Sequence, residues 1–359
     1  MEIKKIFLPL IIIITIISCT NKFKAPDNSV DPNNQKFSDT SYVQQFPVWT
    51  GFNKPQDIII GKETFVYVAD TYNDRIVMMN VAGQILGTKS VKRPVAIDQD
   101  YRLNLVVCAQ FDTTINGINS TYSAVYKIDL YSAGHNLENA KMTRILPKTS
   151  FDFLRSDREY TGVCVFFDNS YYVSRRGPAN TSKVDPDNVI LTFGQIKVSN
   201  GVYRDTLTGR VPLLEPLGTG LMSSNQISSL TAFKGNKYDM IVTMIGNNSF
   251  KSQWLRYVSN LDFTGYENYL EPFYTNMMKV NKFGKPEDVA LDNYNNIYIA
   301  DAEKDSIFKF NSFGDELQSF GGSKIFKSPH AVAFHDKTLY VADTENNRIL
   351  RFILSTDID

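Results

Sequence analysis

Short β-rich runs of apolar residues, bounded by Gly, Asn, Asp and Pro, recur along the chain after its first 41 residues. None of these runs keeps a helical period of about 3.6 residues over three turns. Runs of Val, Ile, Tyr and Phe between turn residues are typical of strands. The hydrophobic pattern therefore predicts an all-β body.

Three of these runs belong to a longer repeated unit, whose copies begin at Lys54, Lys285 and Ser328. Each copy predicts a strand a after a proline, a polar turn, a strand b that ends in Ala-Asp, a tight turn and a strand c. A glycine-containing turn and a strand d follow in the first two copies. A recurring four-strand unit of about 40 residues is typical of the blades of a β-propeller.

The divergent middle of the chain predicts three more blades, which begin at Arg93, Tyr160 and Ile227. The fourth blade should end with a strand d at "NYLEPFY", residues 268–274. The last blade stops at strand c, and the β-like run Tyr42 to Trp49 has no place in the other blades. We therefore expect that this run closes a ring of six blades as strand d of the sixth, covering an exposed edge.

The repeated unit carries the pattern Pro-x-[Asp/Gly]-hydrophobic, then Tyr-[Val/Ile]-Ala-Asp, then Asn-x-Arg-Ile. Residues 54–90, 285–320 and 328–354 follow it well. The unit resembles the NHL repeat, which builds bladed β-propellers. This resemblance implies that residues 42–359 form one NHL-like propeller with six four-stranded antiparallel blades.

The N-terminus predicts a targeting segment. Lys4 and Lys5 precede the apolar run Ile6 to Ile17, which has the length of a signal peptide and is short for a bilayer span. The following Ser18-Cys19 resembles a bacterial lipobox, which implies a lipoprotein signal peptide at residues 1–18 and a lipidated Cys19. An ordinary secretory signal and an uncleaved anchor are the alternatives.

Residues 19–41 are rich in Asn, Asp, Ser, Lys and Pro and predict a flexible tether. Together with lipidation of Cys19, the tether would hold a folded body at a membrane of the cell envelope. That body would lie in the periplasm or at the cell surface.

The charge balance limits the classes of partner. The chain has 38 basic and 38 acidic residues, and phosphate binding by a nucleic-acid-binding protein needs a basic excess, so we expect no nucleic acid partner. Cys108 and Cys164 lie in apolar runs, which indicates either two buried thiols or, less simply, a disulfide of an extracytoplasmic protein.

The repeated turn between strands b and c contains an aspartate in three copies, Asp70, Asp301 and Asp343. These carboxylates can accept N–H bonds of their own turn and pair with the Arg that opens strand c. They could also contact a ligand. We favour the structural interpretation, because a binding site does not need the same turn in several blades.

Strand a starts on the propeller face that also holds the b-to-c loops. Aligning the strands a places a polar residue at the start of each one, around the central channel. These candidate ligand-binding residues are Gln56, Arg93, Thr161, Ser228, Glu287 and His330.

The b-to-c loops of the second, third and fourth blades are expected to be long, and insertions on one face of a repeat protein often mark its binding face. Arg175, Arg176, Asn247 and Trp254 are the candidate rim residues from these loops. Solvated loops without a function are the alternative.

We expect a binding protein, with a protein partner or a small polar ligand on this face. Arg93, Arg175, Arg176 and His330 would favour an anionic group there. No catalytic residues and no metal ligands are predicted, and the chain has no nucleophile motif.

The alternative is a metal-dependent propeller enzyme with its site in the channel. His330 stands where zinc-dependent amidating lyases, which are NHL-type propellers, place histidines. However, zinc needs about three protein ligands, and the other two histidines, His135 and His335, fall elsewhere. For a calcium-dependent lactonase, Glu287 and Gln56 supply only part of an oxygen cage.

Overall fold

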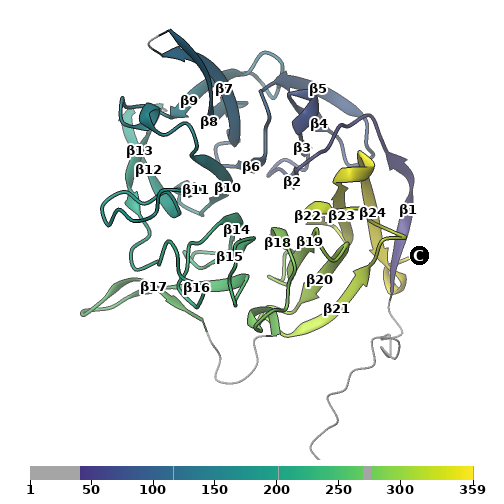
Figure 1. Ribbon diagram of the computed structural model, residues 1–359. Coiled ribbons are helices and arrows are strands. Elements are labelled where there is room, and N and C mark those ends of the chain that lie inside the picture. Colours follow the sequence, from purple (N-terminus) through teal and green to yellow (C-terminus); the bar gives the residue numbers. More distant parts are fainter. Residues whose placement is uncertain (1–40, 116, 201, 270–275, 359) are drawn as a thin grey trace, which may run out of the picture. The chain divides into compact units, whose positions relative to one another are not determined.

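The computed structural model describes residues 41–115, 117–200, 202–269 and 276–358. Their strands form six four-stranded antiparallel sheets around a common axis, as the sequence predicts (Figure 1). The predicted signal peptide, Cys19 and residues 19–40 of the predicted tether lie outside the described residues. No helix in the described part is long and apolar enough to cross a membrane.

The first three blades follow one another along the chain, each with its strand a nearest the axis. Blade 1 consists of β2 (Asp57–Ile60), β3 (Val66–Asp70), β4 (Arg75–Met79) and β5 (Ile85–Ser90). Blade 2 consists of β6 (Ala96–Gln99), β7 (Leu105–Ile115), β8 (Ile118–Asp129) and β9 (Lys141–Leu146). Blade 3 consists of β10 (Glu159–Val165), β11 (Tyr171–Arg176), β12 (Val189–Ser199) and β13 (Val202–Arg210).

The last three blades complete the ring. Blade 4 consists of β14 (Ile227–Ala232), β15 (Met240–Met244), β16 (Ser252–Ser259) and β17 (Thr264–Asn268). Blade 5 consists of β18 (Pro286–Leu291), β19 (Ile297–Asp301), β20 (Ser306–Phe310) and β21 (Glu316–Gly321). Blade 6 consists of β22 (Pro329–His335), β23 (Thr338–Asp343), β24 (Arg348–Leu354) and β1 (Tyr42–Trp49). Short 3₁₀ helices lie in the connections: η1 (Thr71–Asn73), η2 (Asp152–Leu154), η3 (Asn276–Met278) and η4 (Thr344–Asn346). A fifth, η5 (Ser355–Asp357), follows β24.

The strands b are buried on both faces, which explains why their sequences are apolar without alternation. In β3, Tyr67 and Ala69 pack into the core between blades 1 and 2. Val66 and Val68 point to the other side and pack between blades 1 and 6. Side chains on a strand alternate between faces, so one strand serves two inter-blade cores.

The N-terminal strand closes the ring, and this prediction is confirmed. β1 pairs antiparallel with β24, from Tyr42 opposite Leu354 to Trp49 opposite Ile349, and the two strands lie side by side at the right of Figure 1. Trp49 is buried in the core between blades 6 and 1. The first described strand therefore joins the last blade, and no outer strand is missing from blade 6.

The repeated turn is a structural element in the first and last blades. The buried Asp70 accepts the backbone N–H of Asn53 at 2.7 Å and pairs with Arg75 Nε at 2.7 Å. Asp343 pairs in the same way with Arg348 Nε at 2.6 Å. Asp74, at the end of the first of these turns, has a left-handed backbone with φ of 52°, which Asp and Asn tolerate.

Two predictions for the middle blades were wrong in detail. Strand d of blade 4 is β17 (Thr264–Asn268), which ends where the predicted strand began; of that stretch, residues 270–274 lie outside the described part. The predicted b-to-c loop of blade 2 is a β-ribbon, because β7 and β8 stay paired from Leu105 opposite Ile128 to Ile115 opposite Ile118. Thr, Ser and Asn in this stretch suggested a loop, but Thr is also a good strand former.

Candidate functional site

One end of the channel opens into a cavity of about 420 Å³, on the face where the strands a start and the b-to-c connections lie. We call this face the cavity face and this space the central cavity. All six predicted channel residues line it, together with Arg176 from the predicted rim. The lining residues are Gln56, Asp57, Thr71, Tyr72, Arg93, Val95, Ala96, Ala109, Gln110, Ser123, Glu159, Tyr160, Thr161, Arg176, Ser228, Ser229, Glu287, Asp288 and His330.

The predicted alignment of Arg93 was wrong by two residues. Val95 donates its backbone N–H to the strand b residue Cys108, as Gln56 does to Ala69, so Val95 is the true equivalent of Gln56. Arg93 instead precedes a proline and has a left-handed backbone, as Lys54 does in blade 1. The ring at the start of strand a is therefore polar in five blades and apolar in blade 2.

Two of the predicted ring residues bond neighbouring blades. Thr161 Oγ1 donates to the carbonyl of Ile227 at 2.8 Å, and Ser228 Oγ donates to the carbonyl of Pro286 at 2.6 Å. Thr71 makes the same kind of bond to the carbonyl of Pro94 at 2.7 Å. These three hydroxyl groups hold the inner strands together. Because their protons are already donated to backbone carbonyls, they are less available to a ligand than an unpaired side chain would be.

Three other polar side chains on the cavity wall have no hydrogen-bond partner among the described residues. They are the amides of Gln56 and Gln110 and the imidazole of His330. Burial lowers the pKa of His330, so the imidazole is neutral at pH 7 and can both donate and accept a hydrogen bond. All three side chains are half-buried, so their unpaired polar atoms are free to bond water or a ligand in the cavity.

The charged side chains around the cavity are largely compensated. Arg176 Nε lies 2.7 Å from Glu159 Oε2, and Lys285 Nζ lies 2.5 Å from Glu287 Oε1. Arg93 is the least compensated, because the nearest oxygen of Asp74 is 3.9 Å from its Nε. Its guanidinium lies over the ring of Tyr72, 3.7 Å from the centroid, which fixes it at the rim of the cavity.

The wall of the central cavity carries two aspartates, the buried Asp57 and the half-buried Asp288. Asp57 accepts the backbone N–H of Ile97 in blade 2 at 2.6 Å, and Asp288 accepts that of Val332 in blade 6 at 2.9 Å. Each carboxylate thus bonds the inner strand of the next blade. Burial raises the pKa of Asp57 well above its usual range and also raises that of Asp288, and repulsion by Asp288 adds to the shift of Asp57.

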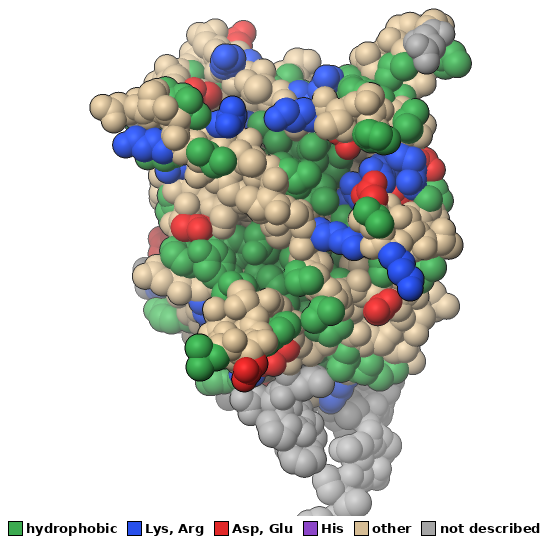
Figure 2. Space-filling model, turned by 90° about the vertical axis from the view of Figure 1, so that its left-hand side faces the viewer, with side chains coloured by type: hydrophobic (Ala, Val, Ile, Leu, Met, Phe, Trp, Pro, Cys, Tyr) green, Lys and Arg blue, Asp and Glu red, His purple; other side chains and the backbone are tan. Residues whose placement is uncertain are grey.

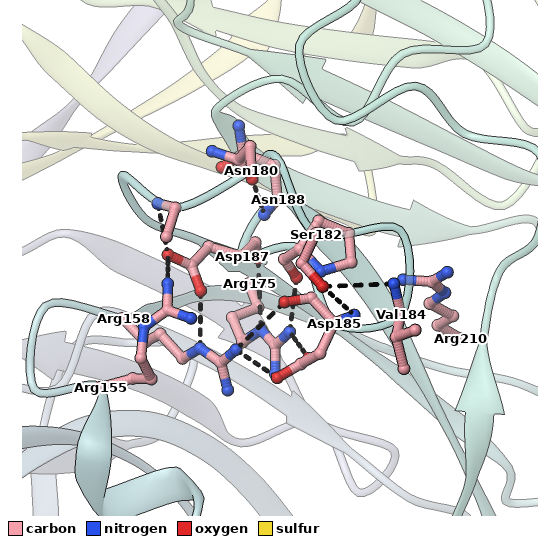
Figure 3. A network of polar contacts seen from close by, with 12 residues as sticks. Arg155, Arg158, Arg175, Asn180, Ser182, Val184, Asp185, Asp187, Asn188 and Arg210 are labelled. Atoms are coloured by element: carbon pink, nitrogen blue, oxygen red, sulfur yellow. Dashed lines mark hydrogen bonds and ion pairs between the residues drawn. The ribbon is translucent and has the colours of Figure 1, made fainter.

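The remaining predicted rim residues do not line the central cavity. Arg175 is buried and bonds Asp185 Oδ1 at 2.6 Å, within the network of Figure 3. Trp254 is buried and stacks on Phe233 with ring centroids 4.4 Å apart, so it belongs to the core. Asn247 is exposed on the b-to-c loop of blade 4.

The alignment of the strands a missed Gln110 and Glu159. Gln110 lies within β7, at the position that Thr71 holds just after β3 in blade 1 when the two blades are aligned by register. Aligning the strands b by their pairing with the strands a would have found it. Glu159 stands opposite Arg176 in the register of β10 and β11, and an expected pairing of these two strands would have placed it there.

The described residues hold no metal-ligand cluster, and Cys108 and Cys164 form no disulfide. Among the described residues, no group of three or more His, Cys, Asp and Glu side chains is placed to hold a metal ion. His135 lies beside Glu63, and His335 ends β22, away from the cavity lining. Cys108 and Cys164 are buried free thiols, and burial raises the pKa of both.

Comparison with known proteins agrees with this geometry. Residues 326–352, which span most of β22 to β24, match the family model of the NHL repeat. No curated protein matches the chain. Many solved structures share the fold.

Three of these structures illustrate the range of proteins that use the fold. A candidate gluconolactonase is 11% identical with a TM-score of 0.54, and the alignment covers 89% of this chain and 93% of that one. The PQQ-bound aldose sugar dehydrogenase of Streptomyces coelicolor is 11% identical with a TM-score of 0.53, covering 88% and 98%. Regucalcin of Agrobacterium tumefaciens, a calcium-binding protein, is 8% identical with a TM-score of 0.52, covering 84% and 90%.

Identities this low establish the fold and leave the function open. The fold, the closure by β1 and the matched repeat agree with one another. The protein is a six-bladed β-propeller with an NHL repeat in its last blade.

Proposed function

We propose that this protein is a lipid-anchored binding protein of the cell envelope, which holds a small, uncharged polar ligand in the central cavity. The observation that carries the proposal is the set of unpaired polar side chains, Gln56, Gln110 and His330, on the wall of one cavity. A volume of about 420 Å³ lies in the range of known small-molecule sites, about 300–1,000 Å³.

The charge distribution favours an uncharged ligand over the anionic one that the sequence suggested. Arg176 and Glu287 already have partners of opposite charge, and Arg175 is buried outside the cavity. Arg93, the least compensated cation, is held over Tyr72 with Asp74 3.9 Å away. Placing an ion beside compensated charges would desolvate the ion without a matching gain. Amides and a neutral imidazole suit hydroxyl and amide groups of a ligand, because each can donate or accept.

A thermal-shift screen of residues 41–359 tests this proposal. The probes are four sets of small compounds: neutral sugars and polyols, neutral amides, carboxylates and amines. We expect stabilisation by a member of the neutral sets, since a ligand that binds only the folded state raises its stability. No shift with any neutral probe, or shifts with carboxylates only, would contradict the proposal.

Two variants connect a positive result to the cavity. Gln56→Ala combined with His330→Ala should abolish the shift. Asn247→Ala is the matched control, since Asn247 is on the cavity face but does not line the central cavity. An unchanged shift in the double variant would place the site elsewhere.

The anchor is proposed from the sequence of residues 1–19 alone. A diacylglyceryl group carries two acyl chains, which is enough for stable membrane attachment. Changing Cys19→Ser should move the protein from the membrane fraction to the soluble fraction and remove the acyl mass from the mature N-terminus. An unchanged fraction and mass would leave the secretory signal or the uncleaved anchor as the explanation.

A further inference from the structure

A second hollow lies on the cavity face, away from the axis, between the b-to-c loop of blade 3 and the connection from blade 3 to blade 4. We call it the loop groove, and its volume is about 570 Å³. The residues that line it are Asn180, Thr181, Ser182, Lys183, Pro186, Val189, Arg210, Val211, Pro212, Leu213, Leu214, Glu215, Pro216 and Ser224. None of them lines the central cavity.

The b-to-c loop of blade 3 forms the first wall of the loop groove, and a partly buried ion network holds it in place (Figure 3). Asp187 is fully buried and bonds both Arg155 and Arg158, with Arg158 Nε at 2.7 Å. Asp185, on the same loop as Asp187, bonds Arg158 and Arg175. Such networks are weak evidence for stability, but they fix one conformation of the chain around them.

The second wall is tied to the first by further polar contacts. Arg210 Nη2 donates to the carbonyl of Lys183 at 2.7 Å. Asn188 Nδ2 donates to the carbonyl of Pro216 at 2.8 Å, and Ser224 Oγ donates to the carbonyl of Asn188 at 2.7 Å. The groove therefore keeps its shape without an occupant, and binding there would cost little ordering of the protein.

The edges of the loop groove expose large aliphatic side chains. Val184, Leu213 and Leu217 are exposed by 87%, 68% and 59%. Hydrophobic patches bordered by Lys and Arg side chains are seen on the side of the molecule that carries blades 2 to 4 (Figure 2). A rigid hollow rimmed by exposed aliphatic side chains is typical of a protein interaction site.

The charges of the loop groove indicate the kind of partner. Lys183 and Arg210 have no carboxylate within ion-pair distance in the described part of the chain, and both are exposed. Glu215 is the one acidic residue among the lining residues given above. The groove thus combines two uncompensated cations with aliphatic edges.

We propose that the loop groove binds an extended segment of a partner protein in which acidic residues stand next to aliphatic ones. The aliphatic side chains would pack against Leu213 and Val184, and the carboxylates would pair with Lys183 and Arg210. This site is separate from the central cavity, so the proposal does not depend on the function proposed for that cavity.

Fluorescence polarisation with synthetic peptides tests the proposal on the full chain, purified in detergent. Three labelled peptides of about eight residues serve as probes: alternating Asp and Leu, alternating Lys and Leu, and alternating Asp and Ser. The Asp-Leu peptide should bind at least about tenfold more tightly than the other two, because it alone meets both requirements. Equal binding of all three, or no binding of any, would overturn the proposal.

Charge reversal locates the interaction. Lys183→Glu should weaken binding of the Asp-Leu peptide by about fivefold or more and strengthen binding of the Lys-Leu peptide, and it keeps the bond from Arg210 to the backbone carbonyl at this position. Leu213→Ser should weaken binding of the Asp-Leu peptide and of the Lys-Leu peptide. Leu261→Ser, at a fully exposed site on another blade, is the control and should change the affinity for neither peptide. Unchanged affinities in the charge-reversed protein would refute the assignment to the loop groove. Lys183 and Leu213 are both exposed, so the two variants should fold.

Discussion

Replacing Trp49 by Ala tests how strongly β1 holds the ring closed. Trp49 is 6% exposed and packs between blades 6 and 1, with its ring 5.7 Å from that of Tyr340 and 4.7 Å from the guanidinium of Arg351. Its indole nitrogen has no hydrogen-bond partner among the described residues, so the variant loses packing and the cation–π contact with Arg351 but no hydrogen bond. Truncating a buried aromatic residue to Ala costs about 3–5 kcal/mol.

That loss is a large part of the stability of a typical domain, about 5–15 kcal/mol. Urea unfolding of residues 41–359, followed by circular dichroism, measures the change in unfolding free energy. Phe46→Ala, on the same strand but 75% exposed, is the matched control and should change it by about 0.5 kcal/mol or less. Deleting residues 40–50 should destabilise the whole propeller. Equal, small effects of Trp49→Ala and Phe46→Ala would refute the role of β1 in closure.

Three further predictions concern the blade contacts and the channel. Thr344 Oγ1 donates to the carbonyl of Pro55 at 2.6 Å. Thr344→Val should lower the unfolding free energy by about 1–3 kcal/mol, because it leaves that buried carbonyl unpaired. An unchanged unfolding free energy in urea would show that this contact is unimportant. Burial raises the pKa of Asp57 and Asp288 above the unfolded value of about 3.9. Below that pH both carboxyl groups are protonated in the folded and the unfolded state, and their contribution to the unfolding free energy is complete. It is lost as the pH rises through the folded pKa. Asp57→Asn should therefore flatten the fall in stability above about pH 4, and identical pH profiles would contradict this. Metal analysis of the purified propeller should find no stoichiometric zinc or calcium, and one equivalent of either would revive the metal-dependent enzyme.

The architecture could be predicted because the repeat encodes it locally. The Ala-Asp turn recurs at Asp70 and Asp343 with the same carboxylate contacts, and each copy sets the length of a blade. Closure by β1 followed from simple counting, since one strand was left over and one blade lacked a strand. These features depend on short-range pattern, which a single sequence contains.

The candidate site could be predicted only in part, because its details depend on register. Alignment on apolar residues placed Arg93 with Gln56, whereas the proline positions show that Val95 is the equivalent residue. The environment of the residues predicted from the b-to-c loops was harder still to predict. Arg175 and Trp254 are ordinary ligand contacts by residue type, but the ion network and the stacking that bury them join residues distant in the chain.

The most direct test of the central claim is affinity selection from a mixture of small molecules, with mass spectrometry to identify what the protein retains. Residues 41–359 are incubated with a bacterial small-molecule extract, separated from unbound compounds and denatured to release the ligand. We predict that an uncharged polar compound is enriched on the unaltered protein and absent from the Gln56→Ala, His330→Ala double variant. The same retained compounds on both proteins, or retention of charged compounds alone, would contradict a polar binding site in the central cavity.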